Sequence, residues 1–202
     1  AKAREKLAAL KVKVGYPDRW RDYSGLVVGD EGYWQNVLAG EQFNFDYQMA
    51  QADKPVQPHI WGMPPQMVNA YYSPNMNEIC FPAAILQPPF FYLEGDDAVN
   101  YGAIGVVIGH EMTHGFDDQG RLYDRVGNLS SWWTDEDSKR FTERTDVLVN
   151  QFNQFDVAPG MKADGRFTLG ENIADLGGLN IAYTAVQKAW KEQVPAENLE
   201  GF

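Results

Sequence analysis

His110-Glu111-Met112-Thr113-His114 places two histidines four residues apart, with a glutamate directly after the first. At about 3.6 residues per turn, positions four apart lie on one face of a helix, so both imidazoles can reach one metal ion. The Glu111 side chain is rotated by about 100° from that of His110, which keeps it beside the metal but out of direct coordination. Glu111 is therefore the candidate base for a metal-activated water.

The same motif also occurs by chance on ordinary helices, where the histidines are polar surface residues. Here the preceding segment is apolar and contains Gly102, Gly105 and Gly109, each of which costs about 1 kcal/mol of helix stability relative to Ala. Small residues in a helix usually permit close packing, so we predict a buried helix over residues 96–116. Two of the three histidines of the chain fall in this motif, which favours a metal site over a solvated helix face.

A third metal ligand has to come from elsewhere, because a catalytic zinc takes three protein ligands and keeps one open position. Six residues after the second histidine the chain has Gly120, so the three-histidine form of the motif is excluded. His59 lies in a proline-rich stretch and Cys80 in a strand pattern, and both are poor candidates. Glu171 and Asp175 remain, one turn apart at the start of a predicted helix. One of them can bind the metal while the other accepts the N–H of a ligand imidazole; without the histidine motif the pair would be a solvated acidic helix start.

Helical and extended patterns alternate along the chain, and helices predominate. A turn signal at residues 73–76 separates two strand-like segments and predicts a β-hairpin. Thr134 precedes three acidic residues, which is typical of a helix N-terminus. The last helix, predicted to begin at Glu171, carries an apolar stripe that includes Leu176 and Leu179. The chain is therefore predicted to be α+β and mainly helical, with a small β-sheet. The predicted helices span about 2–10, 32–52, 96–116, 134–155 and 171–190, and the predicted strands about 11–16, 69–72 and 77–81.

Composition narrows the class of protein. The chain has 202 residues, of which 44% are hydrophobic, so it can bury a sizeable core. Its net charge of −11 argues against nucleic-acid binding, which needs clustered Lys and Arg. A single cysteine excludes an intrachain disulfide, and the longest weakly polar run is too short to cross a bilayer. The chain starts inside a helical pattern without an initiator Met, and we interpret it as a fragment.

Four stretches of the sequence match one known family in order and at close to its spacing. They are residues 69–72, 77–91, 109–117 and 170–178. On these motifs the chain resembles the neprilysin family of zinc endopeptidases, which includes the endothelin-converting enzymes and bacterial oligopeptidase relatives. The resemblance extends from about residue 11 to residue 190, and several motifs in register make it specific.

The resemblance implies a thermolysin-like zincin catalytic fold with one Zn²⁺ per chain. It assigns the zinc to His110, His114 and Glu171. Glu111 is implied as the general base, and Asp175 as the residue that holds the first ligand histidine.

The resemblance also implies how substrate is bound. Asn69 and Ala70 correspond to an exposed edge strand that binds the substrate backbone, and an extended peptide can add itself to such an edge as a further strand. In the family, a hydrophobic pocket receives the residue just after the cut bond. Four residues match its lining, and plain core packing explains them equally well: Ile85, Phe90, Val106 and Val107.

The domain organisation follows from the same comparison. Residues 1–33 correspond to the end of the family's helical second domain or a linker, and residues 34–202 to the zinc-binding part of the catalytic domain. The chain ends before a histidine and an arginine that, in the family, stabilise the tetrahedral intermediate and grip the substrate. On this interpretation the catalytic domain is truncated at its C-terminus.

The predicted function is a zinc-dependent endopeptidase that cuts oligopeptides on the amino side of hydrophobic residues. The alternative is a catalytically incomplete, zinc-containing module that binds peptides without cutting them. A purely structural zinc site is disfavoured, because such sites mostly use four protein ligands rich in cysteine. The expected partners are oligopeptides, without nucleic acid or membrane contact from this segment, and the family implies an extracytoplasmic location. The sequence gives no oligomeric state.

Overall fold

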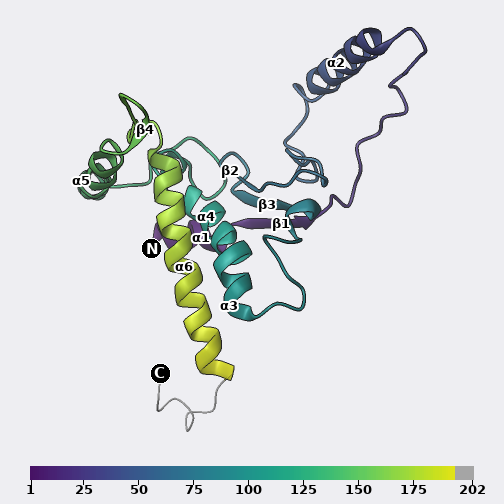
Figure 1. Ribbon diagram of the computed structural model, residues 1–202. Helices are drawn as coiled ribbons and strands as arrows, with labels where there is room; N and C mark the ends of the chain where they lie inside the picture. Colours follow the sequence, from purple (N-terminus) through teal and green to yellow (C-terminus); the bar gives the residue numbers. More distant parts are fainter. Residues whose placement is uncertain (194–202) are drawn as a thin grey trace. The chain divides into compact units, whose positions relative to one another are not determined.

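The computed structural model describes residues 1–193, which divide into two compact units (Figure 1). One unit combines Ala1–Tyr16 with the chain from Met63 onward, and the other is Pro17–Gly62. The predicted division at residue 33 refers to domains of whole family members, so it stays a prediction. Residues 194–202, which belong to the predicted catalytic part, lie outside the described residues.

The smaller unit is built around one helix, α2 (Tyr33–Met49). The guanidinium of Arg21 lies over three aromatic rings, at 4.0 Å from the Tyr47 centroid, 4.8 Å from Phe43 and 5.0 Å from Tyr23. Such cation–π contacts fasten the irregular segment before the helix to the helix itself. All the predicted site residues lie in the larger unit.

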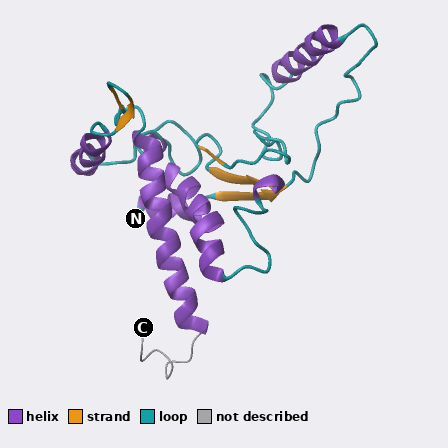
Figure 2. Ribbon diagram, in the orientation of Figure 1, coloured by secondary structure: helices purple, strands orange, loops and turns teal. Residues whose placement is uncertain are grey.

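The larger unit contains a three-stranded sheet in the order β1-β3-β2 (Figure 2). Its central strand β3 (Glu78–Pro82) is buried along its whole length. It pairs in parallel with β1 (Lys11–Gly15) and antiparallel with β2 (Tyr71–Ser73). The predicted hairpin is therefore confirmed, as are the helix α1 (Lys2–Ala8) and the strand that follows it. The hydrophobic core on this sheet comprises Ala70, Ile79, Phe81, Ile85 and Ile104.

The helix predicted over residues 96–116 is present in three segments. It begins with α3 (Asp97–Asn100), capped by the Asp96 carboxylate, which accepts from the Ala98 N–H at 2.8 Å. A π-helical segment, η2 (Tyr101–Gly105), follows, and then α4 (Val106–His114), which carries the histidine motif. The prediction was right in extent, but the π-helical segment was not expected; such segments are frequent near functional sites.

The last helix, α6 (Leu169–Gln193), runs alongside α4 (Figure 1). The two backbones nearly touch, because a Cβ added to Gly109 would lie 2.8 Å from the Gly178 Cα. The close packing predicted from the glycines is thus confirmed at Gly109, whereas a Cβ on Gly102 would meet no atom within 4 Å. The prediction of a buried helix was wrong for most of α4, in which only Gly109 and Glu111 are buried. The helix starts two residues before Glu171, and Leu176 and Leu179 are 50% and 59% exposed. The face of α6 that is buried instead includes Ala174, Gly178 and Ala182.

The remaining elements lie between these two helices in the sequence, apart from one short turn after β3. The helix predicted at Thr134 is α5 (Asp135–Phe152), whose cap is the Thr134 hydroxyl, accepting from the Asp137 N–H at 3.1 Å. A small hairpin, β4 (Asp156–Ala158) and β5 (Met161–Lys162), lies between the helices predicted over 134–155 and 171–190, where no strand was predicted. Two short 3-10 turns complete the secondary structure, η1 (Ala83–Ile85) and η3 (Gly120–Leu122). Within the described residues, no helix combines the length and the apolar character needed to span a bilayer.

Candidate metal centre

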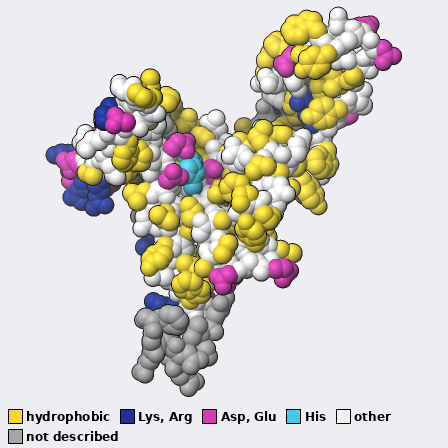
Figure 3. All heavy atoms as spheres, in the orientation of Figure 1, with side chains coloured by type: hydrophobic (Ala, Val, Ile, Leu, Met, Phe, Trp, Pro, Cys, Tyr) yellow, Lys and Arg dark blue, Asp and Glu magenta, His cyan; other side chains and the backbone are white. Residues whose placement is uncertain are grey.

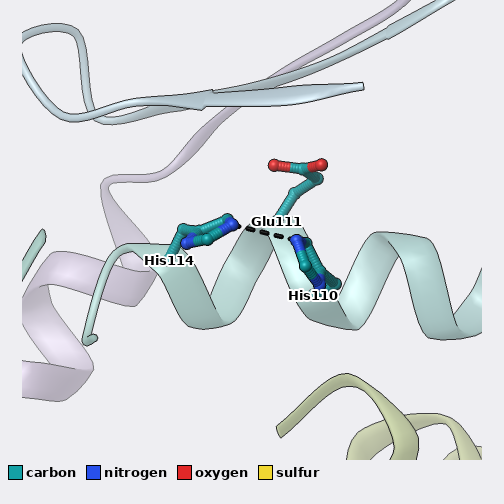
Figure 4. A group of neighbouring side chains, drawn as sticks. All are labelled: His110, Glu111 and His114. Atoms are coloured by element: carbon teal, nitrogen blue, oxygen red, sulfur yellow. Dashed lines mark hydrogen bonds between the residues drawn. The ribbon is translucent and has the colours of Figure 1, made fainter. Parts of the chain in front are cut away.

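Helix α4 presents His110 and His114 one turn apart on the same face, as their spacing predicts (Figure 4). Their Nε2 atoms are 2.9 Å apart and their rings are nearly perpendicular, at 86°. The two nitrogen lone pairs therefore converge on one point beside the helix.

Glu171 reaches the same point from the first turn of α6. Its Oε2 lies 3.3 Å from the Nε2 of His110 and 3.5 Å from the Nε2 of His114. Tetrahedral zinc with ligands at roughly 2.0–2.2 Å needs ligand atoms roughly 3.3–3.6 Å apart. The two distances to Glu171 thus match the separations that one zinc ion requires, and the Nε2–Nε2 distance of 2.9 Å is shorter than that range.

The other nitrogen of each ring faces a carboxylate. The Nδ1 of His110 is 2.8 Å from Asp175 Oδ1, and the Nδ1 of His114 is 2.6 Å from Asp117 Oδ2. Each Nδ1 therefore carries the hydrogen and donates it, which leaves each Nε2 with a bare lone pair. At 2.9 Å the two Nε2 lone pairs repel unless a proton or a metal ion lies between them. With the Glu171 carboxylate within 3.5 Å of both, the residues fit a bound metal ion.

Asp117 was not assigned a role from the sequence. It is buried, and besides holding His114 its Oδ1 accepts from the N–H of Gln119 at 2.9 Å and of Gly120 at 2.6 Å. The signal was present, because an aspartate follows the second histidine by three residues. Helical spacing, however, predicts only which residues share a face within the helix, and Asp117 lies beyond the last residue of α4.

The charges and the burial around the two histidines raise two pKa values. Burial lowers the pKa of His114, but the hydrogen bond and charge of Asp117, with Glu171 and Glu111, outweigh it and leave this pKa raised. Glu111 is 6% exposed. Burial raises its pKa against the opposing effect of the two histidines, and the Tyr72 backbone N–H donates to its carboxylate. A raised carboxyl pKa suits a group that must accept a proton.

Glu111 shares the neighbourhood of the two histidines, since potential ligand atoms of all three lie within 4.8 Å of one another. Its carboxylate nevertheless points away from the Nε2 atoms, toward the sheet (Figure 4). Glu171 has an oxygen within 3.5 Å of both Nε2 atoms. Geometry thus favours Glu171 as the third ligand and leaves Glu111 beside the site.

The histidines line a cavity of about 510 Å³ between α4, the start of α6 and β2. Figure 3 shows histidine atoms set among acidic side chains on the face that it draws. Asn69 and Ala70 line the same cavity, just before edge strand β2. Asn69 is exposed and its Oδ1 accepts from the Ala70 N–H at 2.9 Å, whereas Ala70 is buried.

The four residues matched to a hydrophobic substrate pocket lie elsewhere. Ile85 belongs to the buried core, and Phe90 and Val107 pack against that core. Val106 is half-buried at the start of α4. None of the four is among the described residues that line the cavity, and their assignment to a substrate pocket stays a prediction.

A His-Glu-x-x-His helix joined by a glutamate from a second helix is the arrangement found in zinc metallopeptidases. Residues 69–202 match the model of peptidase family M13, and the chain belongs to this family. It is 42% identical to an endothelin-converting enzyme homolog of Locusta migratoria over 202 residues, 96% of this chain and 28% of that protein. It is likewise 42% identical to neprilysin-3 of Drosophila melanogaster, over 93% of this chain and 25% of that protein.

Solved structures agree with this assignment. An inhibitor complex of the zinc metalloprotease Zmp1 from Mycobacterium tuberculosis has a TM-score of 0.91 and 49% identity, and the match covers all of this chain and 31% of that one. PepO from Lactobacillus rhamnosis has a TM-score of 0.85 and 39% identity, with 92% of this chain and 30% of that one covered. The chain therefore spans less than a third of the length of these relatives.

Proposed function

We propose that the protein is a zinc-dependent endopeptidase of oligopeptides, with zinc held by His110, His114 and Glu171. The observation that carries the proposal is the pair of Nε2 atoms 2.9 Å apart, each on a ring whose Nδ1 faces a carboxylate, with Glu171 Oε2 within 3.5 Å of both. When bound, zinc supplies Lewis acidity, which acidifies a water and polarises the peptide carbonyl.

Glu111 is proposed as the residue that moves the proton. Its raised pKa and its position beside the two histidines suit it to accept a proton from the attacking water. The carboxyl then delivers that proton to the nitrogen of the leaving amine. The Tyr72 N–H holds the Glu111 carboxylate from the strand side throughout.

The remaining roles concern orientation. Asp175 and Asp117 fix the two imidazoles through Nδ1, at 2.8 Å and 2.6 Å. Asn69 and Ala70 are proposed to bind the backbone of a peptide that extends the sheet next to β2. We also infer that cleavage falls on the amino side of hydrophobic residues, with Ile85, Phe90, Val106 and Val107 forming or backing the pocket.

The test is Glu111→Gln in the full-length protein that contains these residues. We expect zinc to be retained and turnover of a short peptide to fall by about 10²–10⁴-fold, the usual contribution of general acid–base catalysis. Glu143→Gln on the exposed side of α5 is the matched control and should leave turnover unchanged. Near-normal turnover in Glu111→Gln would refute the assigned base.

A peptide-binding module without catalysis is the second candidate. The exposure of the site residues on α6 favours this candidate: the side chains of Glu171 and Asp175 are 69% and 76% exposed. Mass spectrometry for new peptide termini, alongside a binding titration with the same peptide, separates the two candidates. Binding without new termini, in both the 202-residue chain and the full-length protein, would favour the module.

The cellular location is also a proposal. An extracytoplasmic site is inferred from the family alone, and fractionation of cells that make the full-length protein would test it. Recovery in the cytoplasmic fraction would contradict the inference.

A further inference from the structure

Lys6 is the most deeply buried lysine among the described residues, at 1% exposure. Its ammonium donates to three backbone carbonyls, those of Gly115 at 2.6 Å, Gly120 at 2.7 Å and Tyr123 at 2.8 Å. An ammonium has three N–H groups, so every donor of Lys6 has a partner. A buried charge is tolerated when it is satisfied in this way.

Aromatic rings enclose the same ammonium. It lies 5.5 Å from the ring centroid of Phe116 and 5.9 Å from those of Tyr72 and Trp132. These are distances at which a ring face attracts a cation. Burial lowers the pKa of Lys6 to about 8, against the charges of Asp117 and Asp124, which raise it. The side chain therefore remains charged at neutral pH.

The three carbonyls all belong to the segment that follows the histidine helix, residues 115–123. Asp117 lies inside this segment, and its Oδ1 accepts from the N–H of Gly120, whose carbonyl Lys6 holds. Its Oδ2 accepts from the Nδ1 of His114. Lys6 thus fixes peptide groups on both sides of the carboxylate that orients a proposed zinc ligand.

Lys6 is itself held in place by the β2–β3 turn. The Asn77 amide donates to the Lys6 carbonyl at 3.0 Å and to the Arg125 carbonyl at 3.2 Å. The Lys11 N–H donates to the Asn77 carbonyl at 2.9 Å. Hydrogen bonds therefore tie the residue that anchors the 115–123 segment to the β2–β3 turn, although 114 positions separate Lys6 from Gly120.

We propose that Lys6 is a positioning residue for the metal centre, its ammonium holding the 115–123 segment so that Asp117 stays aligned with His114. The inference rests on the proposed zinc site. A positioning role differs from a merely structural one. In a merely structural role, Lys6 would affect the stability of the fold but not the hydrogen bond of the His114 Nδ1–H.

In the full-length protein, the experiment compares Lys6→Met, which removes the charge and shortens the side chain by one atom, with Lys2→Met on the exposed side of the same helix. Zinc affinity is measured by competition with a chromophoric chelator, and the Nδ1–H of His114 is followed by nitrogen-edited NMR without zinc. We expect Lys6→Met to lose about 10–100-fold in zinc affinity, the usual cost of an outer-sphere partner. Its His114 Nδ1–H signal should shift or exchange faster, and Lys2→Met should match the wild type in both readouts.

Lys6→Arg keeps the inference testable if the Met variant does not fold. It retains the charge, but the planar guanidinium cannot aim three N–H groups as an ammonium does. We expect it to fold with zinc affinity lowered by about 10-fold. A folded Lys6→Met or Lys6→Arg with wild-type zinc affinity and an unchanged His114 signal would overturn the inference. Wild-type protein that binds no zinc would instead refute the proposed function, and the His114 signal would still decide the role of Lys6.

Discussion

The two proposed ligand histidines are held by carboxylates in opposite surroundings. Asp175, which faces His110, lies on α6 with 76% of its side chain exposed. Asp117, which faces His114, has 7% of its side chain exposed and also accepts from two backbone N–H groups. The same chemical task is therefore performed once at the surface and once in the interior.

This difference shows that the halves of the site depend on different parts of the fold. The α6 half contributes Glu171 and Asp175, and their position is set by how closely α6 packs on α4 at Gly109 and Gly178. The other half consists of His114 and Asp117. It depends on the hydrogen-bond network around Asp117, which includes Lys6. Substitutions should therefore separate a packing defect from a network defect.

Glu171→Ala is expected to have the largest effect, because it removes a proposed ligand. We predict that zinc affinity falls by more than the roughly 10–100-fold that outer-sphere partners cost. The side chain is 69% exposed, so thermal stability of the metal-free protein should hardly change. A competition titration measures the affinity, with Glu192→Ala near the end of the same helix as control. Tight binding in Glu171→Ala would exclude this residue from the metal.

Asparagine substitutions of the two aspartates test the comparison directly. In Asp117→Asn the new NH₂ group would face N–H donors in the interior, whereas in Asp175→Asn the amide can keep its oxygen on His110 and turn its NH₂ to solvent. We predict about a 100-fold loss of zinc affinity for Asp117→Asn, and nearer 10-fold for Asp175→Asn. Only Asp117→Asn should also lower the melting temperature. Equal losses in both readouts would show that burial does not distinguish the two carboxylates.

Sequence reasoning found residues that the structure brings together where their proximity follows from local spacing or from matched motifs. The convergence of His110 and His114 follows from helix geometry, and Glu171 came from the requirement for a third ligand together with the family motif. Lys6 could not be found in this way, because a single sequence does not pair it with carbonyls such as that of Gly120, 114 residues further along.

The buried face of α6 shows a second limit of sequence reasoning. Helical periodicity located an apolar stripe through Leu176 and Leu179, yet both are at least half exposed. Periodicity shows which residues share one face of a helix, but it does not show which face packs against a neighbouring helix or how closely. Here α4 approaches so closely that a Cβ on Gly177 or on Gly178 would collide with it.

Gly178→Ala should have the smallest effect of the series, and it should act on one half of the site. A Cβ there would lie 2.6 Å from the Val106 carbonyl oxygen and 2.8 Å from the His110 backbone nitrogen, so α6 has to move away from α4. Overpacking of this kind costs about 1–3 kcal/mol of stability. A displaced α6 carries Glu171 and Asp175 with it, and we expect zinc affinity to fall several-fold while the His114 Nδ1–H signal keeps its wild-type position.

Gly102→Ala is the matched control, because its added methyl meets no atom within 4 Å. Ala gains up to about 1 kcal/mol of helix propensity over Gly at either position, so the difference between the two variants isolates the contact with α4. Zinc affinity and thermal unfolding are measured on both. If Gly178→Ala shifted the His114 signal as far as the His110 signal, the two halves of the site would not be independent, and the contrast between the packed helix and the buried network would fail.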